Sequence, residues 1–272
     1  MKYEILNDGI YVPSSPDFNI KHILECGQVF RFKHTDFGYT VYSLEHKADV
    51  YCQKDGTKII CKNKNYFINY FDLDTNYAII KSQLDKQNLS DAINYGAGIR
   101  ILKQAPIETI ISFIISANNN IPRIKKTIEK LCEGYGTKYE DYYAFPTLSQ
   151  LSKISLEFFK EIGCGYRAEY LIDTIKKLQS FDFEEISKLD TAKARQLLIS
   201  LKGVGRKVAD CILLFGFYKT DVFPTDTWIT KVYADEVEEN KLSPVKISEY
   251  YANKFGKLSG FAQQYMFYAK RK

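Results

Sequence analysis

The apolar residues of this 272-residue chain change their spacing once, and that change sets the fold class. Before about residue 71 the pattern predicts short strands: Tyr39–Leu44 alternates apolar and polar residues, Lys54–Gly56 is a hairpin turn, and Lys58–Lys62 resumes the strand. From about residue 77 onward the apolar residues recur at helical spacing. We therefore expect an α+β chain, with an α/β domain over residues 1–96 and an all-helical domain over residues 97–272.

Helix-length apolar patterns fill the second part of the chain, and glycines and prolines separate them. We see no internal repeat and no low-complexity tract in the sequence. The expected helices are Ile107–Ala117, Ile121–Glu133, Ser155–Ile162, Ala168–Leu178, Ala192–Leu201, Arg206–Phe217, Thr227–Glu236 and Gln263–Lys270.

The charge of the chain is unevenly distributed. Residues 1–98 carry a net charge of −1 and residues 99–272 carry +6, within a total of +5. Excess cations on one part of a chain indicate a polyanionic partner. The longest uncharged stretches are shorter than the ~20 residues of a membrane span, and Glu4 and Asp8 interrupt any apolar leader. We therefore expect a soluble, intracellular protein that does not bind a membrane.

The positions of cysteine and histidine exclude several kinds of site. The six cysteines form no C-x-x-C pair, so we expect free, buried thiols instead of a zinc ribbon or an iron–sulfur loop. All three histidines precede residue 50. Chemistry in the helical part must therefore proceed without imidazole, which excludes a Ser-His-Asp triad there.

The segment from Leu197 to Asp226 is the most informative part of the sequence. A predicted helix meets Gly203 and Gly205, which stand one residue apart, and a second helix begins directly behind them. The glycines permit a tight turn, and the backbone N–H groups of the turn and of the helix N-terminus suit a phosphate. A helix–helix turn without any ligand remains the alternative interpretation.

Lys207 lies in the first turn of that second helix, which is apolar nearly all round. Such a helix is buried, and both burial and the positive end of the helix dipole oppose an ammonium group. We therefore expect an amine that is easily deprotonated, as a nucleophile requires. Asp226 precedes the helix that begins at Thr227, either as an N-cap or as a carboxylate facing a cation that forms in front of it.

Seven short motifs, taken together, resemble one known family. The first two are the hairpin Leu201-x-Gly-Val-Gly-x-Lys207 and the motif Pro224-x-Asp226. The other five are Cys26-Gly-Gln-Val-Phe-Arg31, Asn118-Asn-Asn-Ile-Pro-Arg123, Gly163-Cys-Gly-Tyr-Arg-Ala168, Val204-Gly-Arg-Lys-Val-Ala-Asp-Cys211 and Gly260-Phe-Ala-Gln-Gln-Tyr-Met-Phe267. They resemble the 8-oxoguanine DNA glycosylases of the helix–hairpin–helix (HhH-GPD) superfamily. The resemblance implies a TATA-binding-protein-like α/β domain followed by a helical HhH-GPD domain.

The resemblance also implies a reaction. Members of this family excise 8-oxo-7,8-dihydroguanine paired with cytosine after flipping the base out of the duplex. By position, Lys207 matches the nucleophile that attacks C1′ of the deoxyribose and forms a Schiff base, after which β-elimination cleaves the strand. Asp226 matches the carboxylate that stabilises positive charge on the sugar.

The lesion pocket implied by the resemblance has four members. The backbone carbonyl of Gly27 matches the acceptor for N7–H, the donor that 8-oxoguanine has and guanine lacks. Cys211 and Phe267 match the two residues that sandwich the base, although core packing is the alternative for both. Gln263 matches the residue that bonds the Watson–Crick edge.

The orphaned cytosine and the DNA backbone have their own implied contacts. Asn118, Arg123 and Arg167 match the residues that hold the cytosine, and Tyr166 matches the wedge that fills the gap in the stack. A loop asparagine, two surface arginines and a partly buried tyrosine are the alternative readings.

The hairpin is implied to bind phosphate through the backbone N–H groups of Gly203, Gly205 and Val208. Trp228 stands where well-known eukaryotic members have a phosphate-binding histidine, and its indole offers one donor and no titratable charge. No cofactor is expected to be required. A structural cation at the hairpin is implied at the carbonyls of Ile199, Leu201 and Val204.

The expected partner is double-stranded DNA that contains 8-oxoguanine, with no obligate protein partner and a monomeric state. The Lys-, Ile- and Asn-rich composition favours a prokaryotic, cytoplasmic protein associated with the nucleoid through DNA. Two alternatives stay open: a monofunctional alkyladenine-type glycosylase, which lacks the hairpin lysine, and a non-catalytic helix–hairpin–helix module that only binds DNA.

Overall fold

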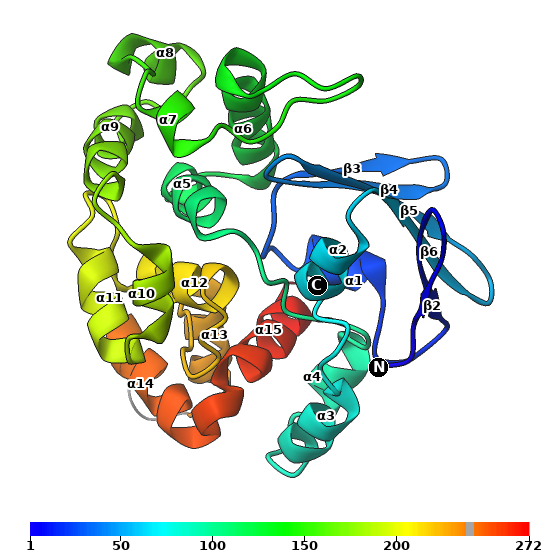
Figure 1. The fold of residues 1–272 in the computed structure, drawn as a ribbon. Coiled ribbons are helices and arrows are strands. Elements are labelled where there is room, and N and C mark those ends of the chain that lie inside the picture. Colours follow the sequence, from blue (N-terminus) through cyan, green and yellow to red (C-terminus); the bar gives the residue numbers. More distant parts are fainter. Residues whose placement is uncertain (238–241, 272) are drawn as a thin grey trace.

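The computed structural model describes residues 1–237 and 242–271. One antiparallel sheet of six strands, in the order β1-β2-β6-β5-β4-β3, occupies one side of the molecule (Figure 1). The α+β class predicted from the two spacings is confirmed. The strands are β1 (Glu4–Ile5), β2 (Gly9–Pro13), β3 (Phe32–Thr35), β4 (Gly38–Ser43), β5 (His46–Cys52) and β6 (Gly56–Cys61).

One face of the sheet is buried along β2, β5 and β6, and β4 is buried on both faces. In β4 and β5 Val41 pairs with Ala48, and in β2 and β6 Ile10 pairs with Ile59; all four side chains are fully buried. Pairing of residues with the same burial fixes the register, because a slip by one residue would turn these side chains to the opposite face. The strands predicted from alternation are therefore confirmed, and β1 to β3 add to them.

Helices make up most of the remaining chain, and all eight predicted helices are present with shifts of a few residues at their ends. Over the described residues no helix is both long and apolar enough to cross a bilayer. The helices are α1 (Ile20–Glu25), α2 (Lys64–Tyr70), α3 (Tyr77–Asp85), α4 (Ser90–Tyr95), α5 (Pro106–Ser116), α6 (Ile121–Tyr135), α7 (Leu148–Leu151), α8 (Leu156–Glu161), α9 (Arg167–Leu178), α10 (Phe183–Lys188), α11 (Thr191–Ile199), α12 (Arg206–Gly216), α13 (Thr227–Glu236), α14 (Pro244–Phe255), the 3₁₀ turn η1 (Gly256–Leu258) and α15 (Ser259–Lys270).

Two hydrophobic cores lie in the molecule. The smaller core joins the sheet to α1 and α2, and it ends along the chain at Leu73 apart from Leu102. The larger core begins with Cys26 and Phe30 and continues from Tyr77 through the helices. The helices α3 and α4 therefore pack with the helical part, where α4 lies against α15 (Figure 1). The predicted boundary after residue 96 stays a prediction.

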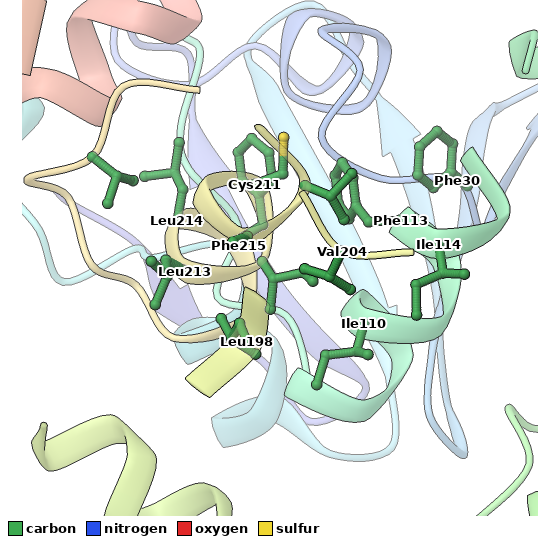
Figure 2. Close-up of a cluster of buried hydrophobic side chains, with 14 of the residues drawn as sticks. Phe30, Ile110, Phe113, Ile114, Leu198, Val204, Cys211, Leu213, Leu214 and Phe215 are labelled. Atoms are coloured by element: carbon green, nitrogen blue, oxygen red, sulfur yellow. The ribbon is translucent and has the colours of Figure 1, made fainter. Parts of the chain in front are cut away.

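The centre of the larger core is the contact between α5 and α12. Figure 2 shows Ile110, Phe113 and Ile114 of α5 facing the hairpin and α12. The Phe113 and Phe215 rings stack with centroids 5.6 Å apart. This packing fixes the direction in which α12 leaves the hairpin, and so it positions the first turn of that helix.

All six cysteines are free thiols, as predicted. Five of them are buried, but Cys52 is exposed, so the expectation of burial is wrong there. The reason is its place as the last residue of β5, where the strand leaves the sheet.

Arg100 is fully buried between the two cores. Its guanidinium donates to the carbonyl oxygens of Phe71 at 3.0 Å, Asp17 at 3.0 Å and Thr75 at 2.9 Å. It also lies 3.9 Å from the centre of the Tyr77 ring. One cation thus satisfies several carbonyl groups that burial would otherwise leave without donors.

The buried Asp72 side chain completes this junction. It accepts hydrogen bonds from the hydroxyls of Tyr77 at 3.0 Å and Tyr218 at 2.5 Å, and Lys103 lies 2.7 Å away. Since Tyr218 follows α12, this carboxylate connects the sheet domain directly to the segment behind the hairpin helix.

We predict that Arg100→Met lowers the free energy of unfolding by about 3 kcal/mol or more, because buried carbonyl oxygens lose their donors. Urea unfolding followed by fluorescence measures this change. The exposed Lys54→Met serves as the control and is expected to stay within about 0.5 kcal/mol of the parent. Similar midpoints for the two variants would contradict the structural role of Arg100.

Candidate active site

The hairpin between α11 and α12 has the geometry that its two glycines predict. Gly203 has a φ of +82°, and a Cβ there would lie 2.3 Å from Cδ2 of Tyr170, so both backbone and space require glycine. Gly205 is the N-cap of α12; a Cβ there would have no atom within 4 Å, and no side chain caps the helix. The first N–H groups of α12 are therefore open to an anion on this surface.

A concave surface adjoins the hairpin. Its lining comes from the hairpin itself, from α9 and from the residue before it, and it includes Tyr166, Tyr170, Lys177 and Lys202. Tyr166 is 54% exposed, and its ring meets that of Tyr170 edge-on with centroids 5.6 Å apart. Exposed tyrosine beside lysine and open backbone N–H groups is a suitable surface for a nucleic acid.

One buried carboxylate holds the hairpin in place. Asp210 of α12 is fully buried and accepts from Nε of Arg195 at 2.6 Å and Nε of Arg206 at 3.1 Å. Ser248 of α14 lies 3.5 Å from the same carboxylate and donates to the carbonyl of Phe223 at 2.9 Å. This network therefore links α11, α12 and α14 to the segment that leads to Asp226.

Lys207 is exposed to solvent, which corrects the expectation that it is buried. Its Nζ lies 5.7 Å from the centre of the Phe113 ring, and protein atoms still surround much of the side chain. Interaction with Cys211 is the largest influence on the pKa of Lys207 and raises it, Asp226 raises it further, and desolvation acts in the opposite direction. The expected easily deprotonated amine is therefore wrong for the free protein, because its neighbours outweigh desolvation.

Cys211 lies one turn after Lys207 and is buried (Figure 2). Burial raises the pKa of the Cys211 thiol to about 11, and the charge of Lys207 acts in the opposite direction. The thiol is therefore protonated at neutral pH and presents an uncharged, polarisable surface next to the amine.

Asp226 takes the N-cap position that we considered from the sequence. Its Oδ1 accepts from the backbone N–H groups of Trp228 and Ile229, each at 3.0 Å. The same carboxylate also interacts electrostatically with Lys207. The two interpretations are thus compatible: the cap fixes the carboxylate, and the charge of the fixed carboxylate acts on the amine.

Gln263 is buried on α15 and reaches the Pro224-x-Asp226 segment. Its Nε2 donates to the carbonyl of Pro224 at 3.0 Å, and its Oε1 accepts from Gln264 at 2.7 Å. Phe267 lies one turn later on the same helix. Gly27, with a φ of +86°, faces this ring, because a Cβ on Gly27 would lie 3.2 Å from Phe267. The structure thus brings Gly27 and Phe267 together and places Gln263 beside the Asp226 segment.

The residues matched to the orphaned cytosine also gather in one place. Arg167 is buried and donates to the carbonyls of Ala117 at 2.7 Å and Asn118 at 2.8 Å, so it is not a surface arginine. Its guanidinium lies 4.5 Å from the centre of the Tyr166 ring. Arg123 is exposed and donates to the carbonyl of Gly163 at 3.1 Å.

Asn118 and Trp228 are both exposed. Asn118 has an exposed side chain and a φ of +50°, a left-handed conformation that asparagine adopts more readily than most residues. Trp228 is 37% exposed, with Nζ of Lys231 4.6 Å from its ring. Val208, in contrast, is buried in α12, so only its backbone can serve a ligand.

The hairpin carbonyls differ in what they already bind. The Leu201 carbonyl accepts from the N–H of Val204 at 3.1 Å, and the Ser200 carbonyl accepts from Nζ of Lys177 at 2.7 Å. A cationic group thus already lies at the turn. Within the described ranges, no group of three or more His, Cys, Asp or Glu side chains is arranged to hold a metal ion.

Two features of the site escaped sequence reasoning. Asp210 is a charged residue in an otherwise apolar stretch of α12, and that contrast could have marked it as a member of a polar network. Arg271 packs on Phe267 with its guanidinium 5.1 Å from the ring centre. The sequence did not indicate this contact, because Arg271 follows the last predicted helix.

Comparison with known proteins decides the family. Residues 10–110 match the model of the 8-oxoguanine DNA glycosylase N-terminal domain, and residues 111–235 match that of HhH-GPD superfamily base excision DNA repair proteins. The chain is 31% identical over 222 residues to a probable N-glycosylase/DNA lyase of Methanothermobacter thermautotrophicus, covering 72% of this chain and 71% of that protein. This chain belongs to the 8-oxoguanine DNA glycosylase family.

Two further relatives extend the family match. The N-glycosylase/DNA lyase OGG1 of Arabidopsis thaliana is 33% identical over 191 residues, which are 64% of this chain and 52% of that protein. A structure of the 8-oxoguanine glycosylase/lyase of Clostridium acetobutylicum, in complex with double-stranded DNA containing cytosine opposite 8-oxoG, superposes with a TM-score of 0.93 at 38% identity. The match covers 100% of this chain and 98% of that one. Family membership therefore extends over both parts of the fold.

We predict that Asp226→Asn lowers the pKa of Lys207, because the carboxylate raises it in the parent, and that Cys211→Ala lowers it too, because it removes the thiolate that forms as the pH approaches about 11. The amine of the parent stays protonated at neutral pH and loses its proton only above the ordinary lysine range. NMR titration of ¹³C-methylated lysine measures the shift. Asp190→Asn, a substitution of the N-cap of α11, is the control and should leave Lys207 unchanged. Unaltered titration in both test variants would contradict the assigned cause.

Proposed function

We propose that this chain excises 8-oxoguanine opposite cytosine from double-stranded DNA and then cleaves the strand by β-elimination. The observation that carries the proposal is the placement of Lys207: the amine is open to solvent, directly behind the hairpin, and interacts with both Cys211 and Asp226. Family membership supports the glycosylase and lyase activities. The Schiff-base step is our own assignment to this lysine.

The proposed reaction begins when the Lys207 ammonium gives a proton to solvent. The nitrogen lone pair forms a bond to C1′ while the C1′–N9 bond breaks, and the departing base takes up a proton from solvent. The attached nitrogen then loses a proton to solvent, the C1′–O4′ bond breaks with O4′ taking up a proton, and a C=N bond forms between Lys207 and C1′. Loss of a C2′ proton to solvent then breaks the C3′–O bond and expels the 3′ phosphate. Asp226, fixed by two backbone N–H groups, stabilises the positive charge that develops on the sugar.

We propose that the flipped base enters next to Gly27. The Gly27 carbonyl accepts N7–H, which guanine lacks, and no hydrogen bond between described residues occupies that oxygen. Phe267 and Cys211 contact the two faces of the base, and Gln263 bonds its Watson–Crick edge. Backbone carbonyls suit this discrimination, because their positions are fixed by the fold and not by a rotamer.

We assign the orphaned cytosine to Asn118, Arg123 and Arg167, with Tyr166 filling the gap left by the flipped base. The exposure of Tyr166 and the anchoring of the Asn118 carbonyl by Arg167 support this assignment. Cytosine presents N3 and O2 acceptors to arginine donors, whereas thymine presents a donor at N3. We therefore attribute the preference for cytosine to the match between its acceptors and the arginine donors.

The backbone contacts form the third part of the proposal. Gly203, Gly205 and Val208 offer N–H groups to phosphate, and Trp228 contacts the strand at the far edge. We also propose a structural cation at the carbonyls of Ile199, Leu201 and Val204; the Nζ of Lys177 on the neighbouring Ser200 carbonyl would compete with it for this turn. With chromosomal DNA as substrate, we place the protein at the nucleoid of a prokaryotic cytoplasm.

The two alternative functions leave part of the site without a role. A monofunctional alkyladenine-type glycosylase does not need an amine at Lys207, and a non-catalytic DNA-binding module does not need a carboxylate held beside it. Borohydride trapping on DNA separates all three possibilities, since only the lysine enzyme forms a reducible covalent adduct.

We predict that Lys207→Gln abolishes strand cleavage and borohydride trapping, because the amide has no nucleophilic lone pair. Binding to DNA should stay close to that of the parent. Gel assays on 8-oxoguanine duplexes with each of the four opposite bases measure trapping, and Lys193→Gln, at an exposed position of α11, is the control. Adduct formation by Lys207→Gln would reject this lysine as the nucleophile.

We predict that Asp226→Asn slows base excision by about 10²–10³, the scale of losing one electrostatic stabiliser. Asparagine is as good an N-cap as aspartate, so α13 should keep its stability while the charge is removed. Single-turnover excision and thermal unfolding are measured on the same variant. Excision within a few-fold of the parent would leave Asp226 with the capping role alone.

A further inference from the structure

Arg271 lies at the wall of the proposed lesion pocket. It follows the last residue of α15, and its guanidinium carbon lies 5.1 Å from the centre of the Phe267 ring. A Cβ on Gly27 would come within 3.0 Å of Nη1 of Arg271 and 3.2 Å of Phe267. The arginine, the aromatic ring and the glycine are thus in mutual contact, although Gly27 comes from the opposite end of the chain.

Within residues 1–237 and 242–271, the guanidinium has no ion pair or hydrogen-bond partner. Its neighbour Lys270, in contrast, forms an ion pair with Asp235 of α13. The two cations at the end of α15 therefore differ: Lys270 links two helices, whereas Arg271 is held against Phe267 with its N–H donors available. A half-buried guanidinium with free donors next to a ligand pocket is placed to bind an acceptor on that ligand.

The lesion offers such an acceptor in the right position. In 8-oxoguanine the N7–H donor and the O8 carbonyl are adjacent on one edge, whereas guanine has an N7 acceptor and a C8–H there. Our proposed function assigns N7–H to the Gly27 carbonyl, and the inference below rests on that assignment. A donor that touches Gly27 then faces the neighbouring atoms of the same edge.

We propose that Arg271 is a specificity-determining residue that donates a hydrogen bond to O8 of the flipped 8-oxoguanine. Together the Gly27 carbonyl and the Arg271 guanidinium form an acceptor–donor pair that is complementary to the N7–H and O8 pair of the lesion. Guanine satisfies neither partner. Discrimination therefore has a second component, supplied by a side chain and not by the backbone.

The test compares binding of damaged and undamaged DNA in the Lys207→Gln background, so that the lesion stays intact. Dissociation constants are measured for duplexes with 8-oxoguanine or guanine opposite cytosine, for Arg271→Met and for the control Lys270→Met. We expect Arg271→Met to reduce the preference for 8-oxoguanine about tenfold, as for loss of one charge-assisted hydrogen bond. Lys270→Met, which also removes one charge, should keep the parent preference.

Other targets of the guanidinium give different results. A phosphate contact would weaken binding to both duplexes equally and leave the preference unchanged, which would overturn the proposal. Duplexes with 8-oxoadenine or adenine distinguish a contact with O8 from a contact with O6. The base 8-oxoadenine keeps N7–H and O8 but has an amino group in place of O6. Arg271→Met should reduce that preference as well, and a loss confined to 8-oxoguanine would overturn the assignment to O8.

The proposed function is tested by the same measurements. If the Arg271-containing protein itself shows no preference for 8-oxoguanine over guanine, the lesion assignment fails as a whole. If it shows the preference and Arg271→Met keeps it, the assignment of Arg271 alone fails.

Discussion

The buried carboxylate of Asp210 is the interaction on which the arrangement of the site depends. A buried charge is stable only with partners close at hand, and here two arginines from α11 and α12 supply them at 2.6 and 3.1 Å. Because Arg195 and Arg206 stand on the two sides of the hairpin, their shared partner fixes the angle between the two helices. Ser248 lies next to the same carboxylate and donates to the carbonyl of Phe223, three residues before Asp226, so the network also holds that segment.

Helix α12 stabilises the fold with its inner face and carries the exposed amine of Lys207 in its first turn. Asp210 is three residues from Lys207 on the same helix, yet one side chain is fully buried and the other is exposed. The inner face of α12 holds the fold through Asp210 and through contact with α5, while the first turn of the helix presents the amine to a ligand. Lys207 and Asp226, the two charged side chains that we propose face the ligand, thus belong to elements that the inner network holds in register.

Much of the fold could be predicted from the sequence, because the relevant signals are local. Alternation in β4 and β5, helical spacing in α12 and the positive φ of Gly203 all follow from neighbouring residues. The surroundings of individual site residues could not, since they come from distant segments. The pKa of Lys207 depends on Asp226 from another element, and Arg167 is buried because the carbonyls of Ala117 and Asn118 lie over it.

Gln263 shows how a pocket can be polar and still be stable without its ligand. Its amide is already engaged, donating to the Pro224 carbonyl and accepting from Gln264. A base that enters as we propose would exchange hydrogen bonds instead of satisfying vacant groups, and the gain in free energy would be the difference between two sets of bonds. A base with the wrong donors and acceptors would break the two hydrogen bonds of Gln263 without replacing them. In the free protein, Pro224 and Gln264 thus already occupy the amide that we propose binds the base.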